Sequence, residues 1–283
     1  MENIIVAEGL RKEYDGFALE DVSFRVPGGA IMGLIGENGA GKTTTIKCLL
    51  NLVRRAAGPV TLLGMDELEG EKEIKQDVGV VLDECFFHDS LRAKDVGVIL
   101  APVYRGWDEE LYRRYLKKYK LPEKKFIKEY SRGMKMKLTI AVALSHQAQL
   151  LVLDEATAGL DPIVRDEILE LFNEFTRDET HSVLISSHIL SDLEKLCDYI
   201  AFLHEGQLLF CEEKDALLEQ YGIFNDTAEQ AEALMPEAIV SMETTPYGGV
   251  RALVRRELAP VGFQLEKPTI EDIILALVKG EQQ

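Results

Sequence analysis

The chain has 283 residues, and its 49 acidic side chains outnumber its 32 basic ones, which gives a formal charge of −17. Hydrophobic residues make up 46% of it. This length and composition suit a large buried core and exclude a disordered, collagen-like or disulfide-stapled chain. The acidity argues against a protein that binds nucleic-acid backbones, because such proteins need a basic face. Nucleotides are still allowed, since local loops hold them.

Short apolar runs alternate with amphipathic stretches along most of the chain. The runs expected as strands are 4–6, 30–35, 60–63, 78–82, 150–153, 182–186 and 199–203. Helical patterns lie between them, as at 161–175. This alternation predicts an α/β fold with a mainly parallel sheet that helices cover on both faces.

Two segments break the alternation. From about 86 to 134 the pattern is almost all helical, which predicts a helical subdomain inserted into the α/β body. After residue 221 come a short helical stretch, two strand-like runs and a last helix, 270–278. We therefore expect a first domain, 1–221, followed by a small α+β C-terminal extension, 222–283.

The N-terminal residues form no basic, apolar leader, and the longest uncharged run, 138–153, is too short and too polar to span a bilayer. The cysteines form no CxxC pair, so we expect reduced thiols rather than a metal or redox site. They are Cys48, Cys85, Cys197 and Cys211. These features favour a soluble protein of the cytoplasm.

Residues 36–43, Gly-Glu-Asn-Gly-Ala-Gly-Lys-Thr, fit the phosphate-loop pattern G-x-x-x-x-G-K-[ST], with an apolar strand before it and a helix after it. Glycines let backbone N–H groups approach phosphate oxygens, Lys42 supplies positive charge, and Thr43 supplies a hydroxyl for Mg²⁺. The expected nucleotide contacts in this segment are Glu37, Asn38, Gly39, Ala40, Gly41, Lys42, Thr43 and Thr44.

Two acids follow the apolar run 150–153. Asp154 ends the strand, where it would hold Mg²⁺ through water. Glu155 stands one residue further on and would accept a proton from an attacking water. Acids at strand ends are common in other proteins, and these two are assigned to Mg²⁺ and to the attacking water only because the phosphate loop is also present. Together they indicate an ATPase or a GTPase.

The remaining motifs resemble those of ATP-binding cassette (ABC) ATPases, over about residues 4–221. Segment 130–134 contains Ser-x-Gly and looks like their signature motif, and 158–161 looks like their D-loop. His188, in Ser-Ser-His, matches their switch histidine. Tyr14 stands where the family stacks an aromatic ring on adenine, and Phe17 is a nearby alternative. The resemblance implies the fold of a P-loop NTPase cassette.

The resemblance also implies a head-to-tail dimer with two ATP molecules between the chains. One chain would supply the phosphate loop and both acids of its strand end. Its partner would offer Ser131 and the N–H of Gly133, at a helix start, to the γ-phosphate. His188 would contact the γ-phosphate, and Asp161 of the D-loop is a further expected nucleotide contact.

Three positions depart from the family pattern. Arg132 replaces the middle glycine of the signature and would either reach a phosphate or ribose or project into solvent. Ala158 stands where Ser is common. After the strand 78–82, where the family usually has Gln, this chain has Asp83, Glu84 and Cys85.

We expect Asp83 in the place of that glutamine, with Glu84 as the alternative. A carboxylate there adds negative charge near the triphosphate, which is tolerable mainly if Mg²⁺ offsets it. The expected metal ligands are therefore Thr43, Asp83 and Asp154. The expected catalytic residues are Lys42, Asp83, Glu155 and His188.

Segments 78–84 and 130–134 look most like ATPases of bacterial ABC-2-type exporters, and in particular like the peptide-export and antibiotic-resistance branch. The resemblance implies an ATPase subunit, a homodimer or a heterodimer with a homologue, at the inner face of the cell membrane. A separate permease would contact Phe86, Phe87 and Leu91, unless these residues pack inside the helical subdomain. The stretch 268–272 resembles the end of such ATPases and favours a structural or dimerisation role for the extension.

Two other functions fit the sequence less well. A soluble ABC ATPase acting on ribosomes or nucleic acid would usually carry a second nucleotide domain or a long coiled coil, and this chain has neither, nor a basic face. A non-hydrolysing nucleotide sensor is disfavoured because the lysine, both acids and the switch histidine are all present. The sequence thus predicts ATP hydrolysis coupled to transport, with ATP and Mg²⁺ bound and no nucleic acid.

Overall fold

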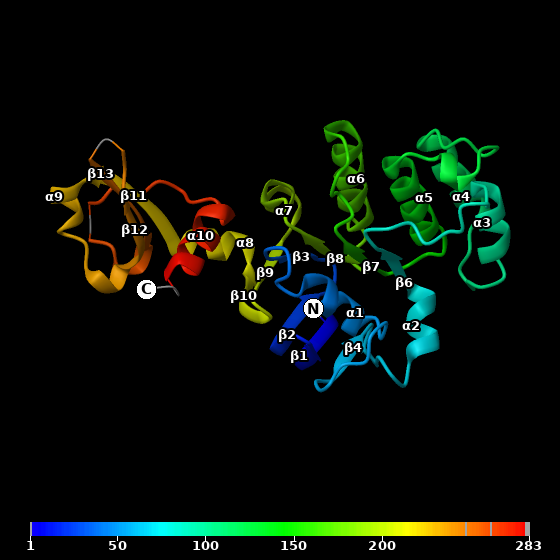
Figure 1. Ribbon diagram of the computed structural model, residues 1–283, viewed down its shortest axis with the longest axis horizontal. Coiled ribbons are helices and arrows are strands. Elements are labelled where there is room, and N and C mark those ends of the chain that lie inside the picture. The colour runs from blue at the N-terminus through cyan, green and yellow to red at the C-terminus, as the bar shows by residue number, and fades with distance from the viewer. Residues whose placement is uncertain (1, 247, 261, 281–283) are drawn as a thin grey trace. The chain divides into compact units, whose positions relative to one another are not determined.

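The computed structural model describes residues 2–246, 248–260 and 262–280 (Figure 1). The chain divides into two compact units, Met1–Cys211 and Glu212–Gln283. The boundary expected after residue 221 falls inside the second unit, and the assignment of domains stays a prediction. Within the described residues, no helix is both long and apolar enough to cross a bilayer.

A six-stranded sheet forms the centre of the first unit, in the order β10-β9-β3-β8-β7-β6. The strands are β3 (Ile31–Ile35), β6 (Val78–Val81), β7 (Leu150–Asp154), β8 (Ser182–Ser187), β9 (Tyr199–His204) and β10 (Gln207–Glu213). The pairs β3–β8, β3–β9, β6–β7 and β7–β8 are parallel, which confirms the predicted mainly parallel sheet. Every residue of β3, β7 and β8 is buried, as expected for strands covered on both faces.

The first unit also contains a second sheet, which the sequence pattern does not predict. It is antiparallel, in the order β2-β1-β4-β5, with β1 (Asn3–Tyr14), β2 (Phe17–Pro27), β4 (Val60–Leu62) and β5 (Met65–Asp66). The runs 4–6 and 60–63, expected in the central sheet, belong to this one. In β2, buried Val22, Phe24 and Val26 alternate with exposed residues, which is typical of a sheet covered on one face.

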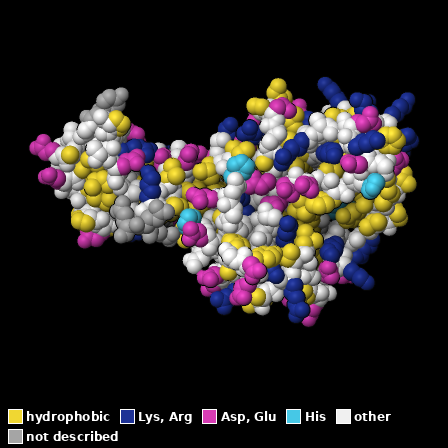
Figure 2. All heavy atoms as spheres, viewed as in Figure 1, with side chains coloured by type: hydrophobic (Ala, Val, Ile, Leu, Met, Phe, Trp, Pro, Cys, Tyr) yellow, Lys and Arg dark blue, Asp and Glu magenta, His cyan; other side chains and the backbone are white. Residues whose placement is uncertain are grey.

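The helices of the first unit fall into two groups. Near the central sheet lie α1 (Lys42–Leu49), α2 (Glu71–Asp77), α6 (Pro162–Phe175) and α7 (Leu190–Leu196). The predicted helical segment contains α3 (Ala93–Leu100), α4 (Glu109–Lys118), the 3₁₀ turn η1 (Ile127–Glu129) and the start of α5 (Arg132–Ser145). These elements share a core of their own that includes Val96, Tyr112 and Leu138. On the face drawn in Figure 2, hydrophobic side chains gather over the region of β6 and α3.

The second unit is built on a three-stranded antiparallel sheet, in the order β11-β13-β12. Its elements are α8 (Lys214–Gln220), β11 (Tyr221–Thr227), α9 (Ala228–Ala231), η2 (Pro236–Ala238), β12 (Ile239–Thr244), β13 (Gly249–Arg255), η3 (Arg256–Leu258) and α10 (Ile270–Gly280). Asp272 accepts hydrogen bonds from the N–H of Thr269 at 2.9 Å and from Arg251 at 2.7 Å. The motif at 268–272 thus caps α10 and ties it to β13, which fits the structural role expected for it.

His146 follows α5 and is 2% exposed. Its ring stacks on Tyr104 with 4.1 Å between centroids, and its Nδ1 lies 3.0 Å from the carbonyl oxygen of Gln76. Burial lowers the pKa of this imidazole, so folding disfavours its protonated form.

We expect acidification from about pH 7 to about pH 5 to lower the Tm of the wild type more than that of a His146→Gln variant. In the unfolded chain the imidazole has a pKa of about 6.5 and takes up a proton on acidification, whereas in the folded chain burial keeps it neutral. The stability from neutral His146 is therefore present above that pH and lost below it. Thermal unfolding across a pH series measures this, with exposed His88→Gln as the control. Equal pH slopes for wild type and His146→Gln would contradict the burial argument.

Candidate functional site

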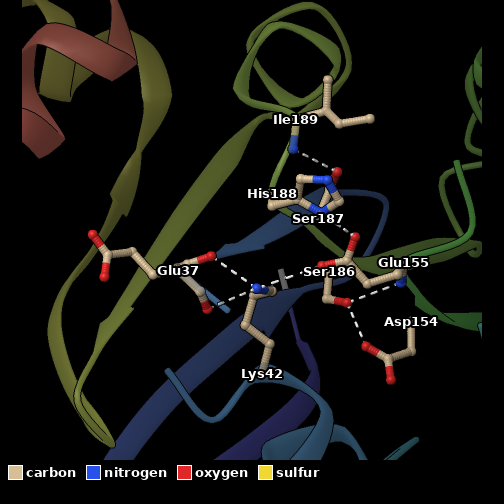
Figure 3. Close-up of polar contacts among 9 residues, drawn as sticks. Glu37, Lys42, Asp154, Glu155, Ser186, Ser187, His188 and Ile189 are labelled. Carbon is tan, nitrogen blue, oxygen red and sulfur yellow. Dashed lines mark hydrogen bonds and ion pairs between the residues drawn. The ribbon is translucent and has the colours of Figure 1, made fainter. Parts of the chain in front are cut away.

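The phosphate loop, the two acids and the switch histidine gather beyond the carboxyl ends of three parallel strands (Figure 3). The phosphate loop, 36–43, follows β3, the acids Asp154 and Glu155 end β7, and His188 follows β8. The strand register sets Ile35 beside Ser187 and Asp154 beside Ser186. Ligands of open α/β sheets bind at this edge, so the topology itself brings together motifs that are far apart in the sequence.

A cavity of about 510 Å³ opens at this edge. It is lined by Phe17, Glu37, Asn38, Gly39, Gly41, Lys42, Thr43, Thr44, Asp83, Arg132, Glu155, Ala158 and His188. Most of the predicted nucleotide contacts and all four predicted catalytic residues therefore line a single cavity. Ala40 is 4% exposed and lies within the loop rather than on the cavity wall.

The phosphate loop has a backbone that only glycine permits. Gly39 has φ +90° and Gly41 has φ +110°, in the region that L side chains rarely adopt. A Cβ on Gly41 would lie 2.6 Å from Leu19 Cδ2, and one on Gly36 would lie 2.5 Å from the carbonyl oxygen of Leu203. The loop leads into α1, whose first N–H groups have no partner within the helix. This cradle fits a phosphate group.

Lys42 is 6% exposed, so its ammonium is a buried charge that needs partners. It donates to the carbonyl oxygens of Gly36 at 2.8 Å and Glu37 at 3.1 Å (Figure 3). It also lies 3.4 Å from Oε1 of Glu155. These contacts point the ammonium across the loop, toward the acids at the end of β7.

Glu155 links the lysine to the switch histidine. Its other oxygen, Oε2, lies 2.7 Å from Nδ1 of His188. Lys42, Glu155 and His188 therefore form one continuous chain of contacts along the cavity. This contact places His188 beside the expected general base, Glu155, and its role in catalysis stays a prediction.

Asp154 is 1% exposed, and its Oδ1 accepts a hydrogen bond from Ser186 Oγ at 2.6 Å. Sequence reasoning used the Ser-Ser-His motif only for its histidine and missed Ser186. The signal lies in the pairing of β7 with β8, which sets Ser186 opposite Asp154. In the described part of the chain, no three His, Cys, Asp or Glu side chains gather as a metal cage.

Asp83, Arg132 of the signature and Ala158 of the D-loop line the cavity, whereas Ser131, Gly133 and Asp161 are not among its lining residues. Ser131 caps α5 by accepting from the N–H of Met134 at 3.3 Å. Asp161 caps α6 in the same way, and Gly133 lies in the first turn of α5. Arg132 lies over the D-loop of its own chain, because a Cβ on Gly159 would be 3.3 Å from its Nη1.

The expected adenine contact, Tyr14, ends β1 and is 47% exposed. Its ring lies 4.7 Å from Lys12 Nζ, measured to the ring centroid. Tyr14 is not among the residues that line the cavity, whereas Phe17, the alternative, is. The structure thus brings Phe17 to the other site residues and leaves Tyr14 at the edge.

Comparison with known proteins matches residues 19–158 to the ABC transporter family. The "Bacitracin transport ATP-binding protein BcrA" of Bacillus licheniformis is 36% identical over 212 residues, which are 74% of this chain and 69% of that protein. The "Lantibiotic transport ATP-binding protein SrtF" of Streptococcus pyogenes is 34% identical over 222 residues, 77% of this chain and 95% of that one. A solved "ATP binding subunit of ABC transporter" has a TM-score of 0.70 at 29% identity and covers 77% of this chain and 92% of that chain.

We expect Gly41→Ala to weaken ADP binding at least about tenfold, because a Cβ at this position disturbs the phosphate cradle. The matched control is Gly64→Ala, in the turn between β4 and β5. Gly64 also has a positive φ, +75°, but nothing lies within 4 Å of its Cβ position. Fluorescence titration with a labelled ADP measures both affinities, and thermal unfolding reports the backbone strain. Unchanged ADP affinity in Gly41→Ala would contradict the assignment of the cradle.

Proposed function

The chain belongs to the ABC transporter family, and from that membership we propose that two chains hydrolyse ATP between them to drive a separate export permease. The observation that carries the proposal is the chain of contacts from Lys42 through Glu155 to His188, at the mouth of the phosphate loop. It combines a phosphate-binding cation, a general base and a group that orients the base. Phosphoryl transfer needs little more from a protein than such positioning and electrostatics.

Each residue of the site has a distinct task in this mechanism. When ATP binds, the ammonium of Lys42 exchanges its contacts with Glu155 and the loop carbonyls for hydrogen bonds to phosphate oxygens. Glu155, held at 2.7 Å by His188, takes the proton of the attacking water. The hydroxyl of Thr43 and the carboxylate of Asp154 are suited to Mg²⁺, which prefers oxygen ligands and few carboxylates beside phosphates. The bound ion supplies positive charge that offsets the charge of the phosphates.

The signature motif supports a shared site. Ser131 and Gly133 begin α5, a helix of 14 residues, yet neither lines the cavity of its own chain. A helix start with a hydroxyl donor suits an anion, and a second chain in head-to-tail orientation would supply that anion. One chain alone then holds half of the donors that each ATP requires, and a monomer is expected to hydrolyse slowly.

A second hollow supports a permease partner. It has a volume of about 370 Å³ and a mainly apolar lining that includes Leu52, Phe86 and Phe87. Phe86 is 72% exposed, whereas Leu91 packs against the core of the helical subdomain. Of the three residues expected at the permease, Phe86 is therefore the best placed. An apolar permease helix would cover Phe86 at the inner face of the membrane. Because the relatives include bacitracin and lantibiotic transport proteins, we expect the exported cargo to be peptide-like.

The Glu155→Gln variant tests the shared site. Loss of the base is expected to reduce hydrolysis at least about a hundredfold while ATP stays bound between two chains. Size exclusion with ATP and Mg²⁺ should then show a dimer that disappears without nucleotide. A variant that remains monomeric with ATP bound would contradict a homodimer, and one that hydrolyses normally would contradict the role of Glu155.

Asp83→Asn tests the departure from the family glutamine. Removing this carboxylate is expected to raise the Mg²⁺ concentration for half-maximal hydrolysis about tenfold, because one negative charge near the metal is lost. Glu84→Gln is the matched control, since Glu84 is also exposed but does not line the same cavity. A shift in Glu84→Gln without one in Asp83→Asn would assign the position to Glu84 instead.

A further inference from the structure

A single buried hydroxyl contacts both acids of the site. Ser186, near the end of β8, is 0% exposed. Its Oγ donates to Asp154 Oδ1 at 2.6 Å and accepts from the N–H of Glu155 at 3.1 Å (Figure 3). Because donation and acceptance are both in use, the hydroxyl cannot rotate without losing one of them. The relative position of the two acids is therefore coupled to this side chain.

The backbone of Glu155 needs such support. Its φ is +50°, in the left-handed region that is uncommon for residues other than glycine. A conformation of this kind persists only where its surroundings hold it. The N–H of Glu155 donates to two atoms of Ser186, the carbonyl oxygen at 3.2 Å and Oγ at 3.1 Å. These bonds hold the peptide from which the carboxylate reaches Lys42 and His188.

The bond to Asp154 is of a different kind. A hydroxyl that donates to a carboxylate at 2.6 Å makes a charge-assisted hydrogen bond, which is stronger than one between neutral groups. It fixes Oδ1 of a carboxylate that is 1% exposed. Within the residues that the structure describes, Oδ2 accepts no hydrogen bond. That second oxygen is thus the one available to a cation.

Ser182, at the other end of β8, shows what a purely structural serine looks like in this strand. It is also 0% exposed and also makes two hydrogen bonds. Its partners, however, are the N–H of Gly29 at 2.9 Å and the carbonyl oxygen of Pro27 at 3.4 Å. Both are backbone groups outside the cavity. Ser182 therefore only satisfies the hydrogen bonds of a buried hydroxyl, whereas Ser186 uses its hydrogen bonds to hold two residues of the site.

We propose that Ser186 is a positioning residue for hydrolysis, whose hydroxyl orients Asp154 for Mg²⁺ and holds the left-handed backbone of Glu155. The proposal rests on the roles proposed above for these two acids. It implies that one side chain adjusts both the metal ligand and the general base, and that nucleotide binding through Lys42 does not depend on it.

The test compares Ser186→Ala, Ser186→Thr and Ser182→Ala in the full chain. For Ser186→Ala, kcat is expected to fall about 10–100-fold with KM within about threefold of wild type. The affinity of the ADP complex for Mn²⁺, measured by electron paramagnetic resonance without hydrolysis, should fall about tenfold, while metal-free ADP binds as before. Ser186→Thr keeps the hydroxyl and should restore most of both values. Ser182→Ala should lower the Tm about as much as Ser186→Ala does, but should leave kcat and the Mn²⁺ affinity unchanged.

Several outcomes would overturn the inference. Equal losses of activity in Ser186→Ala and Ser182→Ala, in step with their Tm values, would mean that the hydroxyl is only structural. Unchanged kcat and Mn²⁺ affinity in Ser186→Ala, beside an inactive Glu155→Gln, would refute Ser186 and leave the proposed function intact. Normal hydrolysis by Glu155→Gln would refute the base itself, and the role of Ser186 would fall with it.

Discussion

The ammonium of Lys42 lies 3.4 Å from a carboxylate oxygen of Glu155 and is bonded to two carbonyl oxygens of the phosphate loop. An isolated buried ammonium would cost more than the roughly 5–15 kcal/mol by which a domain is stable, so these partners are required. A phosphate oxygen competes for the same three N–H donors. In the proposed mechanism, nucleotide binding would therefore take Lys42 away from Glu155, and would couple the binding of phosphate to the freedom of the proposed base.

The central sheet makes this coupling possible. Three parallel strands end at one edge, so a loop, two acids and a histidine from distant parts of the chain lie within contact distance. The strands are buried on both faces and leave little freedom for their ends to shift. The proposed catalytic groups thus stand at the ends of buried strands, while the signature motif stands at the start of α5, in the helical subdomain.

Local patterns were enough to predict much of the site. The phosphate loop is a run of consecutive residues, and Asp154, Glu155 and His188 each follow a recognisable apolar strand. The antiparallel sheet was missed because the pairing of β1 with β2 and β4 joins separate segments, and no single apolar run reveals that pairing. Ser186 was missed because its role depends on the register between β7 and β8, which no local pattern reveals. Tyr14 and Phe17 face each other across the two-residue turn between β1 and β2, so their positions in the sequence do not decide which of them lines the cavity.

The most direct measurement of the central claim is a crystal structure of the wild type with Mg²⁺ and a non-hydrolysable ATP analogue. The account predicts that Lys42 Nζ moves into hydrogen-bonding distance of a phosphate oxygen and away from Glu155. It also predicts that Glu155 keeps its contact with His188, and that Ser131 of a second chain meets the same nucleotide. A nucleotide bound elsewhere, with Lys42 still paired to Glu155, would contradict it.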